Sequence, residues 1–319
     1  METRPVVLIE ADGLYKAFGT TRAVDGVSLS VRAGEAFGLV GPDGAGKTTT
    51  LRLLVGALRA DRGRVAVNGF DLASQVDQAR TGIGYLAQRF SLYGDLTVVE
   101  NLRFFGQVRG LSDAAVERRA RELLDFVGLG GFEARRADRL SGGMKQKLGL
   151  ACALIHEPRV LLLDEPTGGV DPVTRQDFWQ LLIRVLGRGT AVIVTTPYMD
   201  EAARCHRIGF MAGGRVLVEG APRELTHRLA GLVLELGAEP RNRARAIASQ
   251  DPDVLDVQTF GDRLHLRVRA AAGVLERLPL ALSAQGIVVE RLRPVAPQLE
   301  DVFIALLQEH NRAAEAGLQ

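Results

Sequence analysis

The chain has 319 residues, of which 46% are hydrophobic and 24% are charged, and its formal net charge is +2. A chain of this length predicts roughly two domains with an ordinary globular composition. So small a net charge gives no general attraction to nucleic acid, and we therefore exclude nucleic acid as a partner.

The sequence also constrains the compartment and the relation to membranes. The two cysteines, Cys152 and Cys205, lie far apart on predicted helices, which indicates a reduced, cytosolic setting without disulfides or a metal site. No apolar run reaches the ~18 residues that span a bilayer. The N-terminal stretch METRPVVLIEADG lacks the apolar segment of a signal peptide. We expect any membrane role to come through a partner.

The stretch GPDGAGKTTT follows the apolar run AFGLV and matches the phosphate-binding loop pattern. We expect a strand to end before it and a helix to begin near Lys47. Glycines let backbone N–H groups approach phosphates, and the positive end of the helix strengthens this anion site. Lys47 is predicted to reach the β- and γ-phosphates of a nucleotide, and the Thr48 hydroxyl to bind Mg²⁺. The predicted binding residues are Gly41, Pro42, Asp43, Gly44, Ala45, Gly46, Lys47, Thr48 and Thr49.

Residues 89 to about 155 are predicted to form a helical subdomain. Thr97 to Glu100 form a capping box, and the amphipathic stretch SDAAVERRARELLDFVGL follows, with a solvated face of Arg118, Arg119 and Arg121. Next, LSGGM precedes a helix on which Leu148, Ala151, Cys152 and Ile155 recur at helical spacing. Ser141, Gly142 and Gly143, at the start of that helix, form a second anion site. Two such sites are needed if two chains clamp one nucleotide between them.

The stretch RVLLLDEPTGGVDP is typical of a buried parallel strand with two carboxylates at its carboxyl end. Asp164 is predicted to hold Mg²⁺ through its water, and Glu165 to orient and deprotonate the attacking water. An ordinary strand that ends in a solvated acidic pair is the alternative.

Together, the phosphate loop, LSGGM and LLLDEP resemble the ATP-binding cassette (ABC) ATPases, the nucleotide-binding subunits of ABC transporters. The resemblance covers about residues 5 to 220. It implies an α/β fold of the phosphate-loop NTPase class, with a parallel-sheet core, an N-terminal antiparallel β region and a helical subdomain. It also implies ATP and Mg²⁺ as cofactors, and a second cassette, identical or paralogous, paired head to tail. The signature residues 141–143 would then contact the γ-phosphate held by the other subunit.

Further positions take their predicted roles from the resemblance. Phe18 stands where the family stacks an aromatic ring on adenine, and Val24 is counted with the nucleotide-binding residues. Gln88 would contact Mg²⁺ or the attacking water and begin a loop coupled to the membrane subunits. Asp171 lies in the loop that crosses to the partner site, and it is also a typical N-cap before Pro172.

Catalysis is thus assigned to Glu165, Gln88 and Lys47, and metal binding to Thr48, Gln88 and Asp164. For Phe18 a place in the core is the alternative, and for Gln88 a place on the surface.

One position departs from the family. The strand AVIVTT should lead to a histidine that contacts the γ-phosphate and the attacking water, but the chain has Pro197 there. Proline has no side-chain donor and no backbone N–H. If residues 198–206 are helical, His206 lies about 13 Å along the axis, too far to substitute. Two hypotheses follow: pairing with a different cassette whose site keeps a histidine, or self-pairing with slow hydrolysis.

Residues 229–319 are predicted to form a small α+β domain, after a cassette that spans 1–228. The pattern gives a strand, a helix, a hairpin with its turn at Gly261 and Asp262, a helix, a strand and a closing helix, which is a ferredoxin-like split βαβ sandwich. We expect a regulatory or dimerising role for it, and fraying of residues 311–319. The segment PQLEDVFIAL resembles the tail of ATPases from ABC-2 type exporters of drugs, antibiotics and lipids.

The predicted function is the ATP-hydrolysing subunit of an ABC-2 type exporter that powers separate integral membrane permease subunits. Its predicted place is the cytoplasmic face of the plasma membrane. A nucleotide-gated scaffold with weak hydrolysis, the degenerate half of a mixed cassette pair, is the alternative that Pro197 keeps open. A ribosome-associated ABC protein is disfavoured because those carry two cassettes joined by a charged linker.

Overall fold

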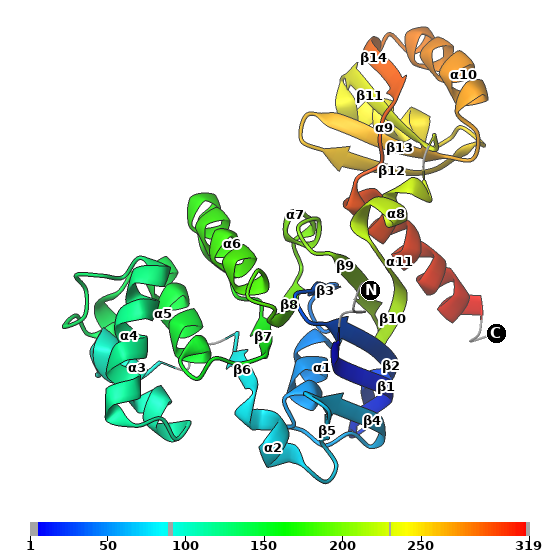
Figure 1. The fold of residues 1–319 in the computed structure, drawn as a ribbon. Helices are drawn as coiled ribbons and strands as arrows, with labels where there is room; N and C mark the ends of the chain where they lie inside the picture. Colours follow the sequence, from blue (N-terminus) through cyan, green and yellow to red (C-terminus); the bar gives the residue numbers. More distant parts are fainter. Residues whose placement is uncertain (1–5, 89–91, 230, 317–319) are drawn as a thin grey trace, which may run out of the picture. The chain divides into compact units, whose positions relative to one another are not determined.

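The computed structural model describes residues 6–88, 92–229 and 231–316. The chain divides into two compact units, Met1–Glu219 and Gly220–Gln319 (Figure 1). The boundary lies before α8 (Pro222–His227), because this helix packs against α11 (Leu299–Ala316) of the second unit. This differs from the predicted boundary after residue 228, which puts α8 in the first domain.

The first unit begins with an antiparallel sheet of strand order β2-β1-β4-β5. Each pair of neighbouring strands in it is antiparallel, as expected for the N-terminal β region. Its strands are β1 (Val7–Phe18), β2 (Thr21–Arg32), β4 (Arg62–Val67) and β5 (Phe70–Asp71).

A second sheet of six strands, in the order β10-β9-β3-β8-β7-β6, forms the centre of this unit. Strands β9, β3, β8, β7 and β6 are paired in parallel. Their carboxyl ends therefore meet at one edge, the edge where α/β sheets bind ligands. Strands β3, β7 and β8 are buried along their whole length, which explains their continuous apolar runs. The six strands are β3 (Ala36–Val40), β6 (Ile83–Leu86), β7 (Val160–Asp164), β8 (Ala191–Thr196), β9 (Arg207–Ala212) and β10 (Arg215–Gly220).

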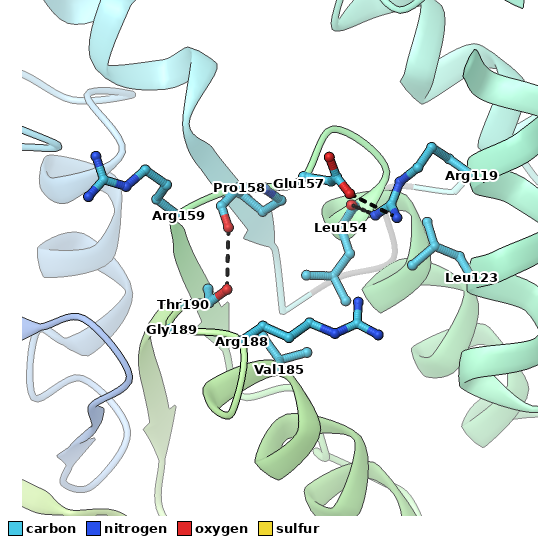
Figure 2. A pocket seen from close by; sticks show the side chains of 10 residues that line it. All are labelled: Arg119, Leu123, Leu154, Glu157, Pro158, Arg159, Val185, Arg188, Gly189 and Thr190. Carbon is cyan, nitrogen blue, oxygen red and sulfur yellow. Dashed lines mark hydrogen bonds and ion pairs between the residues drawn. The ribbon is translucent and has the colours of Figure 1, made fainter. Parts of the chain in front are cut away.

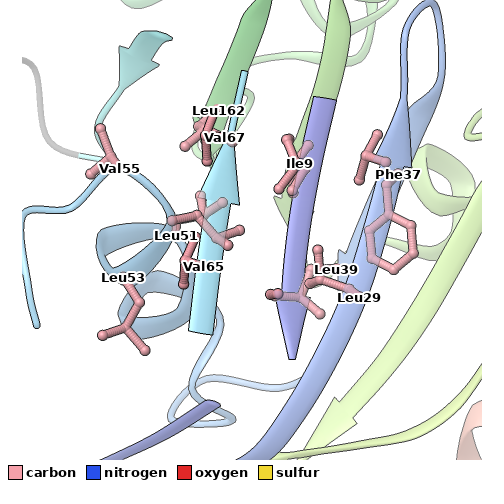
Figure 3. Packing of buried hydrophobic residues seen from close by; sticks show 14 of the residues in the cluster. Ile9, Leu29, Phe37, Leu39, Leu51, Leu53, Val55, Val65, Val67 and Leu162 are labelled. Carbon is pink, nitrogen blue, oxygen red and sulfur yellow. The ribbon is translucent and has the colours of Figure 1, made fainter. Parts of the chain in front are cut away.

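Side chains from both sheets and from α1 (Lys47–Leu54) pack into one core (Figure 3). Ile9 of β1, Phe37 and Leu39 of β3, Leu51 of α1 and Leu162 of β7 are fully buried in it. Full burial of each such side chain stabilises the fold by about 1.5–3 kcal/mol. The loop between β3 and α1 is consequently anchored in the core at both of its ends.

The helical subdomain packs three helices together, α3 (Val98–Val108), α4 (Asp113–Val127) and α5 (Gly142–Leu154). The predicted capping box is confirmed, since Glu100 N donates to Thr97 Oγ1 and Thr97 N donates to Glu100 Oε2. Residues 89–91, where this subdomain was predicted to begin, lie outside the described residues. The remaining helices of the first unit are α2 (Val76–Thr81), the 3₁₀ turn Ala137–Arg139, α6 (Pro172–Leu186) and α7 (Met199–Ala202).

One prediction for the surface of α4 is wrong. Arg118 and Arg121 are exposed, but Arg119 is only 9% exposed. Its guanidinium pairs with Glu122 and with Glu157, which follows α5. The amphipathic pattern placed Arg119 on the polar face, whereas the packing of α4 against α5 covers it.

The second unit has the strand order β12-β13-β11-β14, with all neighbouring strands antiparallel. Along the chain its elements follow the β-α-β-β-α-β order that the sequence predicts for a split βαβ sandwich. Helix α11 continues to Ala316, so the prediction that the chain frays from residue 311 is wrong for residues 311–316. The elements are β11 (Val233–Glu239), α9 (Arg241–Ala248), β12 (Val254–Phe260), β13 (Arg263–Val268), α10 (Ala271–Ala284) and β14 (Val288–Pro294).

Two further observations concern the whole described chain. No helix in residues 6–88, 92–229 and 231–316 is both long and apolar enough to cross a membrane. Cys152 and Cys205 are buried and free. Cys205 lies in the turn after α7, and not on a helix as predicted.

Candidate nucleotide-binding site

The loop Gly41–Gly46 joins β3 to α1 at the carboxyl edge of the central sheet, as predicted. Gly46 has φ +104° and is the N-cap of α1. A Cβ at Gly46 would lie 2.1 Å from Ala23 O, and one at Gly41 would lie 2.1 Å from Met211 O. Only glycine fits these two positions, because neighbouring backbone touches the loop on both sides.

Lys47 is the most enclosed charged residue of the loop, with 4% of its surface exposed. Its Nζ donates to Gly41 O at 2.8 Å and to Pro42 O at 3.0 Å. The same Nζ lies 3.2 Å from Glu165 Oε1. The ammonium group is thus held at the centre of the loop, next to the predicted base.

The end of β7 brings together the residues predicted to hold Mg²⁺. Asp164 Oδ1 accepts hydrogen bonds from Thr48 Oγ1 and from Thr195 Oγ1, each at 2.9 Å. Gln88 Nε2 donates to Glu165 Oε2 at 2.8 Å. No cluster of three or more His, Cys, Asp or Glu residues that could hold a metal occurs among the described residues. A hydroxyl, one carboxylate and an amide fit Mg²⁺, which prefers oxygen ligands and takes the rest from phosphates and water.

Glu165 has an unusual backbone. Its φ is +48°, a left-handed conformation that is uncommon outside glycine. Its N–H donates to Thr195 O at 3.2 Å and to Thr195 Oγ1 at 2.9 Å, which ties it to β8. Such strain costs of order 1–3 kcal/mol and is typical of functional sites. The bend turns the carboxylate of Glu165 toward Lys47 and Gln88.

A cavity of about 470 Å³ opens over these residues. Several of its lining residues were not predicted, because they come from the start of β2 and from the turn between β9 and β10. Ala45 O accepts from Gly214 N, so that turn is bonded to the phosphate loop. No local motif marks such residues, and only the pairing of distant strands brings them here. The unpredicted lining residues are Thr21, Arg22, Ala23, Gly213 and Gly214.

Comparison with known proteins supports one family. Residues 24–168 match the family described as "ABC transporter". The chain is 40% identical over 306 residues to the probable multidrug ABC transporter ATP-binding protein YbhF of Escherichia coli, covering 94% of this chain but about half (52%) of YbhF. It is 37% identical to the daunorubicin/doxorubicin resistance ATP-binding protein DrrA of Streptomyces peucetius, covering 96% of this chain and 94% of DrrA. A dimeric ATP-binding cassette in a post-hydrolysis state with ADP and Pi matches with TM-score 0.62 and 27% identity, over 67% of this chain and 98% of that one.

The chain belongs to the ATP-binding cassette family. Members of this family bind and hydrolyse ATP, and the gathering of Lys47, Thr48, Asp164 and Glu165 at one sheet edge agrees with that chemistry. The family fold expected from the sequence is confirmed for the cassette by the match to solved cassettes.

The signature of this cassette lies apart from its own cavity. Ser141 is exposed and caps α5, because its Oγ accepts from Met144 N at 3.3 Å. Gly143 packs so closely on Thr174 that a Cβ would lie 2.4 Å from Cγ2 of that threonine. Asp171 caps α6 through Val173 N and Thr174 N, which confirms the predicted N-cap. Residues 141–143 and Asp171 do not line the cavity over Lys47, and their contact with nucleotide stays a prediction.

Phe18 and Val24, both predicted to bind nucleotide, differ in their surroundings. Phe18 is 51% exposed at the end of β1, so a place in the core, the alternative reading of Phe18, does not apply. Val24 is 1% exposed, belongs to the core and does not line the nucleotide cavity. Phe18 remains available for stacking, whereas the Val24 side chain is enclosed by its neighbours.

Pro197 directly follows β8. Thr196 is paired with Val40 of β3, so Pro197 lies at the level of Gly41. Tyr198 and the residues after it do not form the long helix assumed for the His206 estimate, since α7 ends at Ala202. His206 Nδ1 instead accepts from Ala36 N at 3.0 Å, at the opposite end of β3. His206 therefore lies away from the phosphate loop, as predicted, although α7 is shorter than that prediction assumed.

A fully buried carboxylate holds the segment after Pro197 in place. Glu201 is 0% exposed and accepts from Thr196 Oγ1 at 2.6 Å and from Thr167 Oγ1. Arg175 Nε of α6 lies 3.5 Å from Glu201 Oε1. One side chain thus joins the end of β8, the loop after β7 and α6. No sequence motif marks Glu201, because Thr167 and Arg175 are distant from it in the chain.

Proposed function

We propose that this chain is the ATP-hydrolysing subunit of an ABC-2 type exporter. The observation that carries the proposal is the convergence of Lys47, Thr48, Asp164, Glu165 and Gln88 at the carboxyl edge of one parallel sheet. The export reading is supported by relatives named for multidrug transport and for daunorubicin/doxorubicin resistance.

Nucleotide binding starts from the loop and Lys47. The loop N–H groups and the N-terminus of α1 favour an anion in the cavity. Lys47 Nζ donates to two backbone carbonyls, and phosphate oxygens would accept from it more strongly because they carry negative charge opposite the ammonium. We therefore expect Lys47 to exchange its carbonyl partners for the β- and γ-phosphates.

Hydrolysis requires a base beside the γ-phosphate. Glu165 would accept the proton of the attacking water, while Gln88, bonded to the same carboxylate, orients that water. Thr48, Asp164 and Gln88 would hold Mg²⁺, which supplies charge stabilisation of the phosphates. Binding of ATP also separates Lys47 from Glu165, so that the carboxylate is released for its role as a base.

The complete site is proposed to need a second cassette. The exposed N-terminus of α5, with Ser141 to Gly143, is an anion site without an anion partner in its own cavity. Paired head to tail, each signature would cover the nucleotide held by the other subunit. Integral membrane permease subunits are the proposed further partners, and the cytoplasmic face of the plasma membrane the proposed place.

Pro197 supports a second candidate, the weakly hydrolysing half of a mixed pair. Proline offers no donor where the family has a histidine, and His206 is engaged at the other end of the sheet. In a mixed pair the other subunit would supply an intact site. In a self-pair both sites would turn over slowly.

The test is hydrolysis and dimerisation of the purified full chain with ATP and Mg²⁺. A Ser141→Arg variant should still bind ATP with wild-type affinity, because the loop of the same chain is intact, but should lose dimerisation and hydrolysis. If the monomeric Ser141→Arg variant loses ATP affinity as well as hydrolysis, the signature belongs to the site of its own chain. That result would refute the two-chain arrangement. Wild-type dimers that hydrolyse no ATP would instead favour the mixed pair.

A further inference from the structure

A second cavity lies at the opposite end of the central sheet from the nucleotide site. Its volume is about 450 Å³, close to that of the nucleotide cavity. Pro158 and Thr190 line it, and they precede β7 and β8. Its other walls come from α4, α5 and α6 (Figure 2). A cavity of this size can enclose a small organic molecule.

The walls combine apolar side chains with guanidinium groups. Leu123, Leu154 and Val185 supply the apolar surface, and each is buried. Arg119 of α4 and Arg188, in the turn after α6, extend toward the same side of the cavity, whereas the guanidinium of Arg159 points away (Figure 2). Two positive groups on the walls of one cavity repel each other, and an anion bound beside them would reduce that repulsion.

Arg119 is buried with incomplete pairing. Its Nη2 makes only a long hydrogen bond, 3.4 Å, to Leu154 O. Its Nε is buried and has no hydrogen-bond partner among the described residues. Its two acidic partners, Glu122 and Glu157, both pair with Nη1 and are themselves 52% and 71% exposed, so water weakens these ion pairs. Burial of a guanidinium costs free energy unless hydrogen bonds compensate it.

Arg188 has no acidic partner in the part of the chain that the structure describes. Its guanidinium carbon lies over the Phe126 ring, 5.1 Å from the ring centre, in a cation–π contact. Among the described residues that line the cavity, Glu157 is the one carboxylate, against the two guanidinium groups of Arg119 and Arg188 that face it. The lining therefore carries an excess of positive charge.

We propose that this cavity binds an amphipathic organic anion, with the acidic head between Arg119 and Arg188 and the apolar part on Leu123, Leu154 and Val185. A small hydrated anion such as phosphate would leave the apolar walls uncovered, and a neutral lipid-like molecule would leave Arg188 without an acidic partner. The ligand would connect the helical subdomain, through α4 and α5, to α6.

The experiment uses the full chain and the fluorescent sulfonate 8-anilinonaphthalene-1-sulfonate, titrated with saturating ATP present to keep the probe out of the nucleotide cavity. Arg188→Glu should weaken probe binding about ten- to a hundredfold, the range for loss of one charge-assisted contact. Glu157→Gln should strengthen binding severalfold, since it removes the competing carboxylate. Arg118→Glu, the same charge change on an exposed face of α4, is the control and should change binding less than twofold.

Competition by octanoate and octan-1-ol then tests the chemical class. Octanoate should displace the probe from the wild-type chain at a concentration at least tenfold lower than octanol. Equal displacement by the two, or equal weakening by Arg188→Glu and Arg118→Glu, would overturn the proposal. If Arg188→Glu does not fold, Glu157→Gln decides alone, because unchanged or weaker probe binding in that variant contradicts the site.

Discussion

Lys47 Nζ lies 3.2 Å from Glu165 Oε1, so the residue proposed to hold phosphate is paired with the residue proposed to activate water. Both side chains are largely enclosed, 4% and 13% exposed. An ion pair in this position keeps each charge compensated without nucleotide, and it must open when phosphates enter.

Lys47→Ala should weaken ATP binding about ten- to a hundredfold, because it removes the enclosed cation that meets the phosphates. Isothermal titration with ATP and Mg²⁺ measures this. Arg64→Ala, which removes a cation that is 72% exposed on β4, is the control and should bind like the wild type. Equal affinity in Lys47→Ala and wild type would remove Lys47 from the binding role.

Glu165→Gln should lower the rate of hydrolysis at least about 10²-fold and leave the Kd for ATP within a factor of about three. The amide keeps the shape of the side chain but cannot accept a proton. Single-turnover release of phosphate measures the rate, and Glu117→Gln on the exposed face of α4 serves as the control. Hydrolysis at the wild-type rate would mean that another group is the base.

Pro197→His should raise turnover of a self-paired dimer, by up to about 10²–10³-fold, the range for one contact made in the transition state. The pairing of Thr196 with Val40 places position 197 beside the start of the phosphate loop. Pro197→Ala separates loss of the proline from gain of the imidazole, and should not raise the rate. No gain with histidine would contradict the role assigned to this position.

Glu201→Ala should lower the free energy of unfolding by about 3 kcal/mol, since Thr167, Thr196 and Arg175 then lose a buried charged partner. Urea denaturation measures the change. Asp200→Ala is matched to it, because Asp200 pairs with the same arginine but is 59% exposed, and it should cost less than about 1 kcal/mol. Similar losses in both variants would show that burial at Glu201 is not what stabilises this segment.

The stability of the fold should depend on His156 in mild acid. Burial, and then the nearby Arg109, lower the pKa of His156 from 6.5 to about 4. Its Nε2 lies 3.1 Å from Ile83 O and must carry the proton, while Nδ1 has no partner among the described residues. Between pH 6.5 and 4 the unfolded chain binds the proton and the folded chain does not, so the free energy of unfolding falls as the pH falls.

That loss should reach at most about 3 kcal/mol by pH 4. His156→Gln keeps a donor toward Ile83 O and removes the titration. Denaturation curves at pH 7 and at pH 4.5 should therefore differ less for this variant than for the wild type. Identical pH dependence in the two proteins would place the acid sensitivity elsewhere.

The phosphate loop, the capping box at Thr97 and the buried strands could be predicted, because each depends on a few contiguous residues. Gly46 and Thr97 illustrate this, since the first permits a left-handed backbone and the second caps its own helix. Helix limits set by packing were predicted less well. The stretch after Pro197 looked helical as far as His206, but α7 ends at Ala202 and His206 instead bonds to β3.

The order of the elements and the chemistry available at the carboxyl edge of the central sheet follow from the amino-acid sequence, because backbone propensity and motif spacing are local properties. The folded structure was needed to show that Lys47 faces Glu165, that Arg119 is buried and that Glu201 joins three segments. Those facts depend on which distant segments pack together. A linear pattern carries no information on whether a polar side chain at its edge meets water or another element.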